Sequence, residues 1–130
     1  MIEEAIYTLV TTDTATKALI GTRFYPLTIP QDAALPACAY QVVSENQEYH
    51  HQGPCGWATK RLQITITAES YLGGVKAVAA AIKARLSGYK GTLGTVKIHS
   101  IFFMNAFDSD YVESGLVTVR QDYEINYQED

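Results

Sequence analysis

The sequence predicts an α+β fold: a single domain in which two main helices pack on one face of a mixed, mostly antiparallel β-sheet. A chain of 130 residues, 47% of them apolar, is long enough for one domain with its own core. Apolar residues recur every three or four positions near the start and again after residue 70, as in amphipathic helices. They alternate with polar residues over 61–69 and 115–128, as in half-buried strands. We expect residues 1–130 to form one domain, with an extended hairpin or loop over 44–59.

Two main helices follow from the apolar spacing. The first has Glu3 and Glu4 at its positive end and one apolar stripe: Ile2, Ala5, Ile6, Leu9 and Val10. A short helical turn follows, capped by Thr12 or Asp13 and ended by Gly21. The strongest helix starts at the N-cap Ser70, stops at Gly88 and has the apolar stripe Leu72, Val75, Ala79, Ile82 and Leu86.

Four longer strands are predicted, over 37–43, 61–69, 95–107 and 115–128. The third has apolar residues on both faces around 101–104, which favours a central position in the sheet. Because a strand, a helix and a strand follow one another, we expect a right-handed crossover that joins parallel strands. Flanking hairpins add antiparallel pairs. We expect a turn at 91–94 and a polar connection at 108–114.

Composition excludes several classes of protein. Ten basic and fourteen acidic side chains give a net charge of −4, which argues against a grip on nucleic acid. The acidic start and the lack of a long apolar run argue against a leader peptide and a membrane span, so we expect a protein made in the cytosol. Cys38 and Cys55 are too few for a disulfide framework and are expected as free thiols. Nine tyrosines are typical of a chain with contact surfaces.

The segment 44–59 joins two strands but has no apolar face. With turn residues at 53–56, the simplest geometry is a hairpin whose arms extend the flanking strands more than about 20 Å beyond the core. The alternative is a disordered surface loop. As a docking arm it would use Tyr49 and Trp57 as aromatic anchors, with His50 also at the interface.

Catalytic and metal-binding patterns are weak. His50 and His51 are adjacent and leave a strand on opposite faces, and no ligand spacing joins them to Cys55 or His99, so we expect no metal and no cofactor. The glycines near residue 90 follow a helix and precede a strand, the reverse of a phosphate loop. No nucleophile signature is present. We therefore expect no enzyme activity.

A small acidic group comprises Asp108, Asp110 and Glu113. Such carboxylates could serve acid–base chemistry or a loose cation site, but neither a calcium-loop spacing nor a nucleophile accompanies them. The simpler interpretation is that they keep a surface loop solvated.

The order of elements resembles the small tail completion proteins of long-tailed (siphovirus-type) bacteriophages, which include tail terminators and head-to-tail joining proteins and also occur in prophages and gene-transfer particles. The resemblance covers almost the whole chain and rests on order and spacing. The segments that carry it are 1–5, 21–26, 30–36, 40–44, the Gly53-Pro54 turn, the Gln63-Ile64 strand, the alanine-rich helix and 91–94.

The resemblance implies a structural virion protein that forms a ring, expected to be a hexamer, at the head-proximal end of the tail. The ring caps the tail tube and joins it to the head connector, and DNA passes through it without being held. Its partners are further copies of the chain, the tube protein and the connector or stopper protein, with no membrane. Since a ring needs two different contact surfaces, we expect Tyr49, Trp57 and Tyr111 at contacts and the acidic group Asp108, Asp110 and Glu113 facing the lumen.

Two alternatives stay open. The chain could be a tail tube or minor capsid component, in which case it would stack into long tubes. It could also be a small non-enzymatic module that binds a ligand on its sheet face, in which case a specific ligand would raise its melting temperature.

Overall fold

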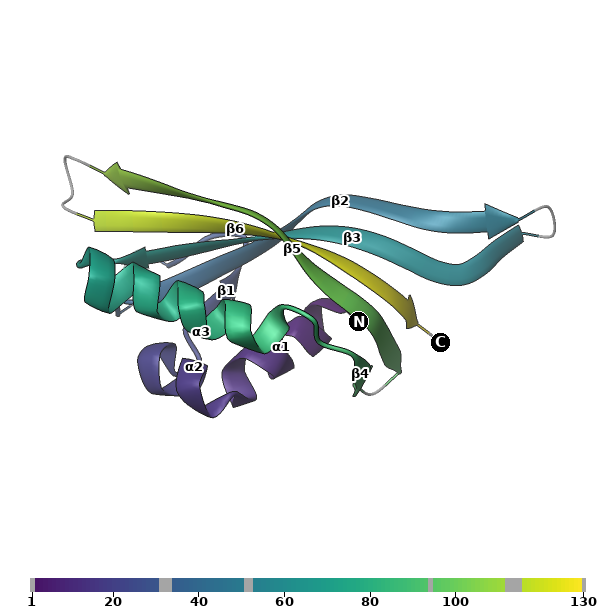
Figure 1. Ribbon diagram of the computed structural model, residues 1–130, viewed down its shortest axis with the longest axis horizontal. Helices are drawn as coiled ribbons and strands as arrows, with labels where there is room; N and C mark the ends of the chain where they lie inside the picture. Colours follow the sequence, from purple (N-terminus) through teal and green to yellow (C-terminus); the bar gives the residue numbers. More distant parts are fainter. Residues whose placement is uncertain (1, 31–33, 51–52, 94, 112–115, 130) are drawn as a thin grey trace.

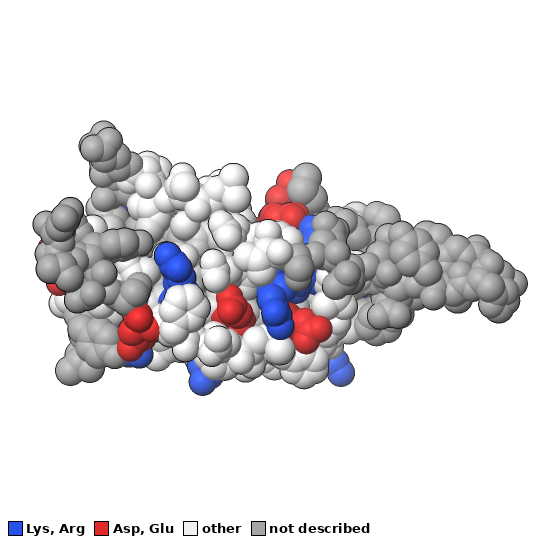
Figure 2. Space-filling model, turned by 90° about the horizontal axis from the view of Figure 1, so that it is seen from above, with Lys and Arg blue, Asp and Glu red and all other residues white. Residues whose placement is uncertain are grey.

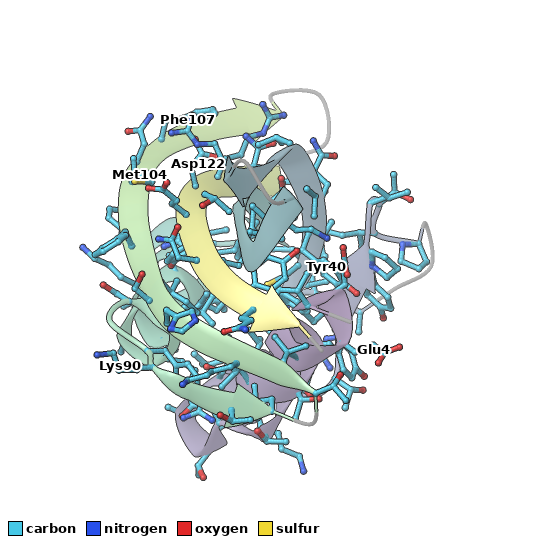
Figure 3. The ribbon with its side chains drawn as sticks, turned by 90° about the vertical axis from the view of Figure 1, so that its right-hand side faces the viewer. Glu4, Tyr40, Lys90, Met104, Phe107 and Asp122 are labelled. Atoms are coloured by element: carbon cyan, nitrogen blue, oxygen red, sulfur yellow. The ribbon has the colours of Figure 1, made fainter. Side chains whose placement is uncertain are left out.

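Helices cover one face of a six-stranded sheet in the computed structural model, and the other face is uncovered (Figure 1). The structure describes residues 2–30, 34–50, 53–93, 95–111 and 116–129, with the backbone alone at 44–50, 53–57, 71–72, 109–111 and 129. The longer strands curl into a half-barrel (Figure 3). The predicted α+β class is confirmed.

The sheet is mixed and mostly antiparallel, as predicted. Its strand order is β1-β2-β3-β6-β5-β4, and the only parallel pair among the described strands is β1 with β2. The strands are β1 (Phe24–Pro26), β2 (Ala37–His50), β3 (Gly53–Ala68), β4 (Gly91–Leu93), β5 (Val96–Tyr111) and β6 (Leu116–Glu129). The predicted turn at 91–94 is thus wrong, because Gly91–Leu93 is a short edge strand. Residues 108–111 likewise continue β5 instead of forming a loop.

The chain segment with α3 joins two strands that run in the same direction, as expected, but these strands do not pair with each other. β3 and β5 run in the same direction, because each is antiparallel to β6, but β6 lies between them. β5 and β6 follow each other in the sequence and pair as a hairpin. The other edge of β6 pairs with β3, from Trp57 to Ala68 of β3. Antiparallel pairing on both sides of β6 gives straighter hydrogen bonds than a parallel pair would.

β5 is not central, contrary to prediction. Only β4 lies outside it, and β4 pairs with no β5 residue beyond Ile98. The apolar residues on its second face are exposed: Phe102 by 52%, Met104 by 45% and Phe107 by 42%. Figure 3 shows Met104 and Phe107 at the top of the arch, away from the helices. Apolar side chains on two faces indicated a strand covered on both sides, but the second face has no layer over it.

The two main helices are α1 (Ile2–Thr12) and α3 (Lys76–Leu86), with the short α2 (Thr14–Ile20) between them in sequence. Asp13 caps α2 as expected, since its carboxylate accepts from the Thr16 backbone N–H at 3.1 Å. The predicted Ser70 cap is wrong, because a π-helical turn, Tyr71–Val75, precedes α3. Within that turn the Val75 N–H donates to the Ser70 carbonyl at 3.1 Å.

The core lies between the helices and the inner face of the sheet. The apolar stripes of α1 and α3 are buried against the alternating residues of β3 and β6, of which Ile64, Ile66, Val119, Tyr123 and Ile125 are almost fully buried. The polar residues that alternate with them point to the uncovered face. No helix within the described ranges is long and apolar enough to span a membrane.

Candidate functional site

The predicted hairpin is present in the backbone. β2 and β3 pair outward through Asn46 with Thr59 and Gln47 with Ala58, and end on His50 with Gly53 (Figure 1). β6 accompanies β3 only as far as Trp57. The part of the hairpin with just two strands is therefore 48–56, shorter than the whole segment predicted as an arm. About four residues per arm correspond to roughly 13 Å of protruding ribbon.

The turn predicted at 53–56 is not found there, because these residues belong to β3. Residues 53–56 were expected to form it, but Gly53 already pairs with His50 as the first residue of β3. Proline in this strand lies near the tip, where a missing ladder donor costs least. Tyr49 is opposite Pro54 and Trp57 is opposite Gln128 in the strand registers. The side chains of Tyr49, His50 and Trp57 lie outside the described residues, and so does His51.

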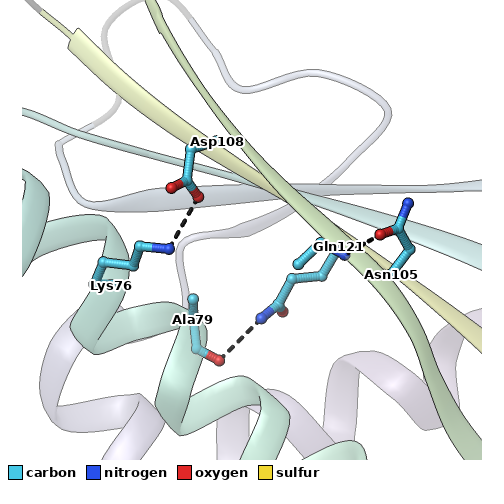
Figure 4. Close-up of polar contacts among 6 residues, drawn as sticks. Lys76, Ala79, Asn105, Asp108 and Gln121 are labelled. Atoms are coloured by element: carbon cyan, nitrogen blue, oxygen red, sulfur yellow. Dashed lines mark hydrogen bonds and ion pairs between the residues drawn. The ribbon is translucent and has the colours of Figure 1, made fainter.

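The acidic group is spread along one strand and beyond it. Asp108 lies on β5 opposite Val119, and Asp110 lies opposite Val117. The Asp108 carboxylate accepts from Lys76 Nζ at 3.0 Å, at the start of α3 (Figure 4). One of the three carboxylates thus has a basic partner on the helix side of the sheet. Glu113 and the side chains of Asp110 and Tyr111 lie outside the described residues.

The thiols and histidines form no site in the described part of the chain. No group of three or more His, Cys, Asp or Glu side chains converges there. Cys38 is a free thiol, as expected, and burial raises its pKa well above the ordinary value, which makes it unreactive. His99 is half-buried on β5. The chemistry required for catalysis or metal binding is not assembled here.

A groove lies on the uncovered face of the sheet, at the end opposite the hairpin. It has a volume of about 620 Å³. One wall is the segment after β1, and the floor is formed by β2, β3 and β6. The lining residues are Leu27, Thr28, Ile29, Pro30, Leu35, Ala39, Gln41, Gln63, Thr65, Thr67, Leu116 and Arg120. Apart from Arg120, they are uncharged.

Arg120 is the distinctive residue of the groove. Its Nε is buried and has no hydrogen-bond partner among the described residues. Its guanidinium carbon lies 5.7 Å from the centre of the Phe107 ring. Asp122, the next acidic residue on this face of β6, accepts from Gln63 Nε2 at 3.2 Å instead of pairing with Arg120. Within the described residues, the groove therefore combines a positive charge whose Nε has no hydrogen-bond partner with apolar side chains.

Charges elsewhere on this face are mixed. Figure 2 shows single Lys and Arg residues among Asp and Glu, without a basic patch on the described part of this face. Such a surface lacks the clustered positive charge that a nucleic-acid grip requires.

Sequence reasoning missed the groove and the exposed apolar residues of β5. The signal for Phe102, Met104 and Phe107 was present as apolar residues on both faces of one strand, and was interpreted as a central position. The groove depends on how the segment 27–30 lies against three strands that are far apart in sequence. No local pattern encodes that arrangement.

The described residues combine an α+β fold with a protruding two-stranded hairpin, and no group of three or more metal-ligating side chains converges among them. Residues 4–128 match the family model "Tail completion protein gp17". The chain belongs to that family. It is a non-enzymatic structural component of the phage tail and hence of the virion.

A solved structure agrees on the fold. A chain of the "Virion of native gene transfer agent (GTA) particle" aligns with a TM-score of 0.73 over 95% of this chain and 91% of that one, at 17% identity. No curated protein matches the chain. At such low identity the likeness shows a shared fold, and the family model identifies the class.

Proposed function

We propose that the protein closes a ring, of six copies, at the head-proximal end of the tail tube. The ring stops growth of the tube, binds the last ring of tube protein on one side and presents a surface to the head connector on the other. DNA passes through its centre. The carrying observation is that one subunit has two unlike surfaces at opposite ends, the β2–β3 hairpin and the β5–β6 end (Figure 1). Contacts between unlike surfaces generate rings when the rotation closes.

The proposal assigns roles to the predicted residues. Tyr49, His50 and Trp57 lie on the hairpin and Tyr111 near the tip of β5, where they would contact a neighbouring subunit or a partner. Asp110 and Glu113 would face the lumen with Asp108, giving DNA a negative wall along which it slides. The two-stranded tip of the hairpin has little core of its own, so contact with a neighbour would order it.

Electron microscopy and native mass spectrometry of the purified protein, alone and mixed with tube protein, test this function. The proposal expects single rings or monomers alone, and tubes that stop growing when the protein is added. Long self-assembled stacks would instead identify a tail tube component. Tubes that grow to the same length with and without the protein would overturn the capping role.

A further inference from the structure

We propose that the groove on the uncovered face receives the β2–β3 hairpin of a second copy of the chain. The inference rests on the proposed ring and names the two surfaces that make its repeating contact.

The distance between the hairpin tip and the groove means that a hairpin can fill only the groove of another copy. Thr65 on the groove floor and Cys55 near the hairpin tip are ten residues apart on the same strand, β3. At about 3.3 Å per residue, the tip lies roughly 33 Å from the groove of its own chain. A hairpin therefore reaches a groove only between molecules. The contact is between unlike surfaces at opposite ends of the subunit, as a ring requires.

Charge favours this pairing. Between residues 44 and 59 the sequence has two acidic side chains, Glu45 and Glu48, and no Lys or Arg. Among the described lining residues of the groove, Arg120 is charged and none is acidic. Arg120 Nε is buried without a partner in the described structure. A buried donor without an acceptor is costly, and a carboxylate from the neighbour would supply a charge-assisted bond.

Shape and polarity agree with an inserted hairpin tip. The volume of about 620 Å³ falls within the range of sites that hold a small ligand, and so accepts a few side chains rather than a folded domain. Leu27, Ile29 and Leu35 give one apolar wall for an aromatic ring, while Gln41 and Thr65 offer hydrogen bonds to polar groups. The hairpin sequence has both kinds of side chain, with Tyr49 and Trp57 among glutamine, asparagine and histidine.

Cross-linking tests the contact between the groove and the hairpin of another copy in a chain that keeps Arg120. In Thr65→Cys, a short bismaleimide should join the new thiol to the native Cys55 of another copy and give dimers and longer ladders on a denaturing gel. Cys38 is fully buried and does not compete. Thr65→Cys with Cys55→Ser, and Lys90→Cys on an exposed site away from the groove, are the controls. Without dimers from micromolar to millimolar protein, or with equal dimers from Lys90→Cys, the proposal is overturned.

Charge reversal tests the role of Arg120. Arg120→Glu in the Thr65→Cys background should lower the dimer yield by at least about tenfold, whereas Lys90→Glu, with the same change in net charge, should not. Adding Glu45→Lys and Glu48→Lys to Arg120→Glu should restore the yield. An unchanged yield in Arg120→Glu overturns the charge pairing.

Native mass spectrometry separates the two proposals. Closed rings in which Thr65→Cys does not cross-link to Cys55 would overturn the groove contact but would still support the proposed ring. Cross-linked chains that never close would support the groove contact and overturn the ring.

Discussion

Gln121 is a buried polar residue on the inner face of β6, and its side chain is hydrogen-bonded to a helix. It is 3% exposed and donates through Nε2 to the Ala79 carbonyl of α3 at 3.1 Å (Figure 4). Its Oε1 accepts from the Tyr123 hydroxyl at 2.9 Å. Burial raises the pKa of Tyr123, so its hydroxyl stays protonated and remains a donor. Gln121 thus joins the helix layer to the sheet at a fixed point.

Gln121→Leu should lower the free energy of unfolding by about 1–3 kcal/mol, because the Tyr123 hydroxyl loses its buried acceptor. Urea denaturation measures the change. Gln41→Leu, at an exposed position, should stay within about 0.5 kcal/mol of the parent. Adding Tyr123→Phe to Gln121→Leu should recover part of the loss. Equal stability of the two glutamine variants would contradict the role of this hydrogen bond.

The ion pair of Glu3 and Lys60 predicts a pH dependence. The Lys60 Nζ lies 2.8 Å from Glu3 Oε1, and side-chain exposure is 11% for Lys60 and 30% for Glu3. Burial acts to raise the pKa of Glu3, but the hydrogen bond and charge of Lys60 outweigh it and hold the pKa below the ordinary 4.5. A lowered pKa means that the stabilisation is fully present above 4.5 and is lost as the pH falls through the folded value.

Glu3→Gln should therefore cost on the order of 1 kcal/mol at neutral pH, and the difference from the parent should narrow as the pH falls below 4.5. Denaturation curves between pH 7 and pH 3 measure it. In a Lys60→Met background the narrowing should be reduced, because the hydrogen bond and charge of Lys60 no longer lower the pKa of Glu3. A difference that is constant with pH would show that the pair does not stabilise the fold.

At the scale of the element, β5 has one buried and one exposed apolar face. Phe103 packs edge-on against Tyr123, with ring centres 5.6 Å apart, and Lys83 Nζ lies 4.2 Å from its ring centre. Phe102 is opposite Glu124 on the other face and is half exposed. Phe102 and Phe103 are adjacent in sequence, but we expect only Phe103 to contribute strongly to the stability of the fold.

Phe103→Thr should cost about 2–3 kcal/mol of unfolding free energy, and Phe102→Thr less than about 1 kcal/mol, since threonine retains the preference for strand in both. Thermal or urea unfolding of the matched pair measures the contrast. Equal losses would mean that the second face of β5 is covered as well.

The hairpin predicts a separation of stability from assembly. Replacing residues 48–57 by Asn-Gly would close the hairpin after the Gln47–Ala58 pair and remove the tip without touching the core. The unfolding free energy should change by less than about 1 kcal/mol, while tail completion should be lost. Tyr49→Ser and Trp57→Ser keep the length and show whether the aromatic rings carry the effect. A shortened chain that is fully active in tail completion would dispose of the docking arm.

For the whole molecule, the net charge of −4 leads to a prediction about DNA passage. Asp108 already pairs with Lys76, so replacing it would also break an ion pair. The charge reversal therefore keeps Asp108 and combines Asp110→Lys with Glu113→Lys. If these residues line the lumen, the reversed charges should hold the DNA and slow its ejection by about tenfold or more. Lys90→Glu is a charge-changing control. Unchanged ejection in particles that contain the double variant would count against a lumen position.

Local signals account for the part of the fold that the sequence predicts. Asp13 before a helical turn, the apolar stripe of α1 and the alternation in β3 and β6 depend on neighbours within a few residues, and all are found. The position of β5 in the sheet depends on which strand pairs with the other edge of β6. That pairing is between distant parts of the chain, so no short stretch of sequence predicts it. Ser70 is not the N-cap of α3, because a π-helical turn at 71–75 comes between them and the N-cap position of α3 is Val75.

The candidate site likewise has a part that the sequence predicts, the hairpin, and a part that it does not, the groove. A segment without an apolar face, between two strands and with turn residues, predicted a hairpin or loop over 44–59, and the pairing of β2 with β3 confirms the hairpin backbone up to His50 and Gly53. The place of the turn was wrong because Gly53 and Pro54 have the composition of a turn but pair as the start of a strand. The groove around Arg120 brings together the segment after β1 and three strands, so only the tertiary structure reveals it.

The last strand in the sequence, β6, lies in the middle of the sheet, between β3 and β5. During synthesis, the β2–β3 hairpin and β5 emerge from the ribosome before the strand that must join them. Until β6 arrives, neither half has a complete core face, because Val119, Tyr123 and Ile125 supply the centre of it. Without β6, the inner faces of β3 and β5 lack the strand that lies between them. The order of the strands therefore makes the centre of the core depend on the last of these six strands to be synthesised.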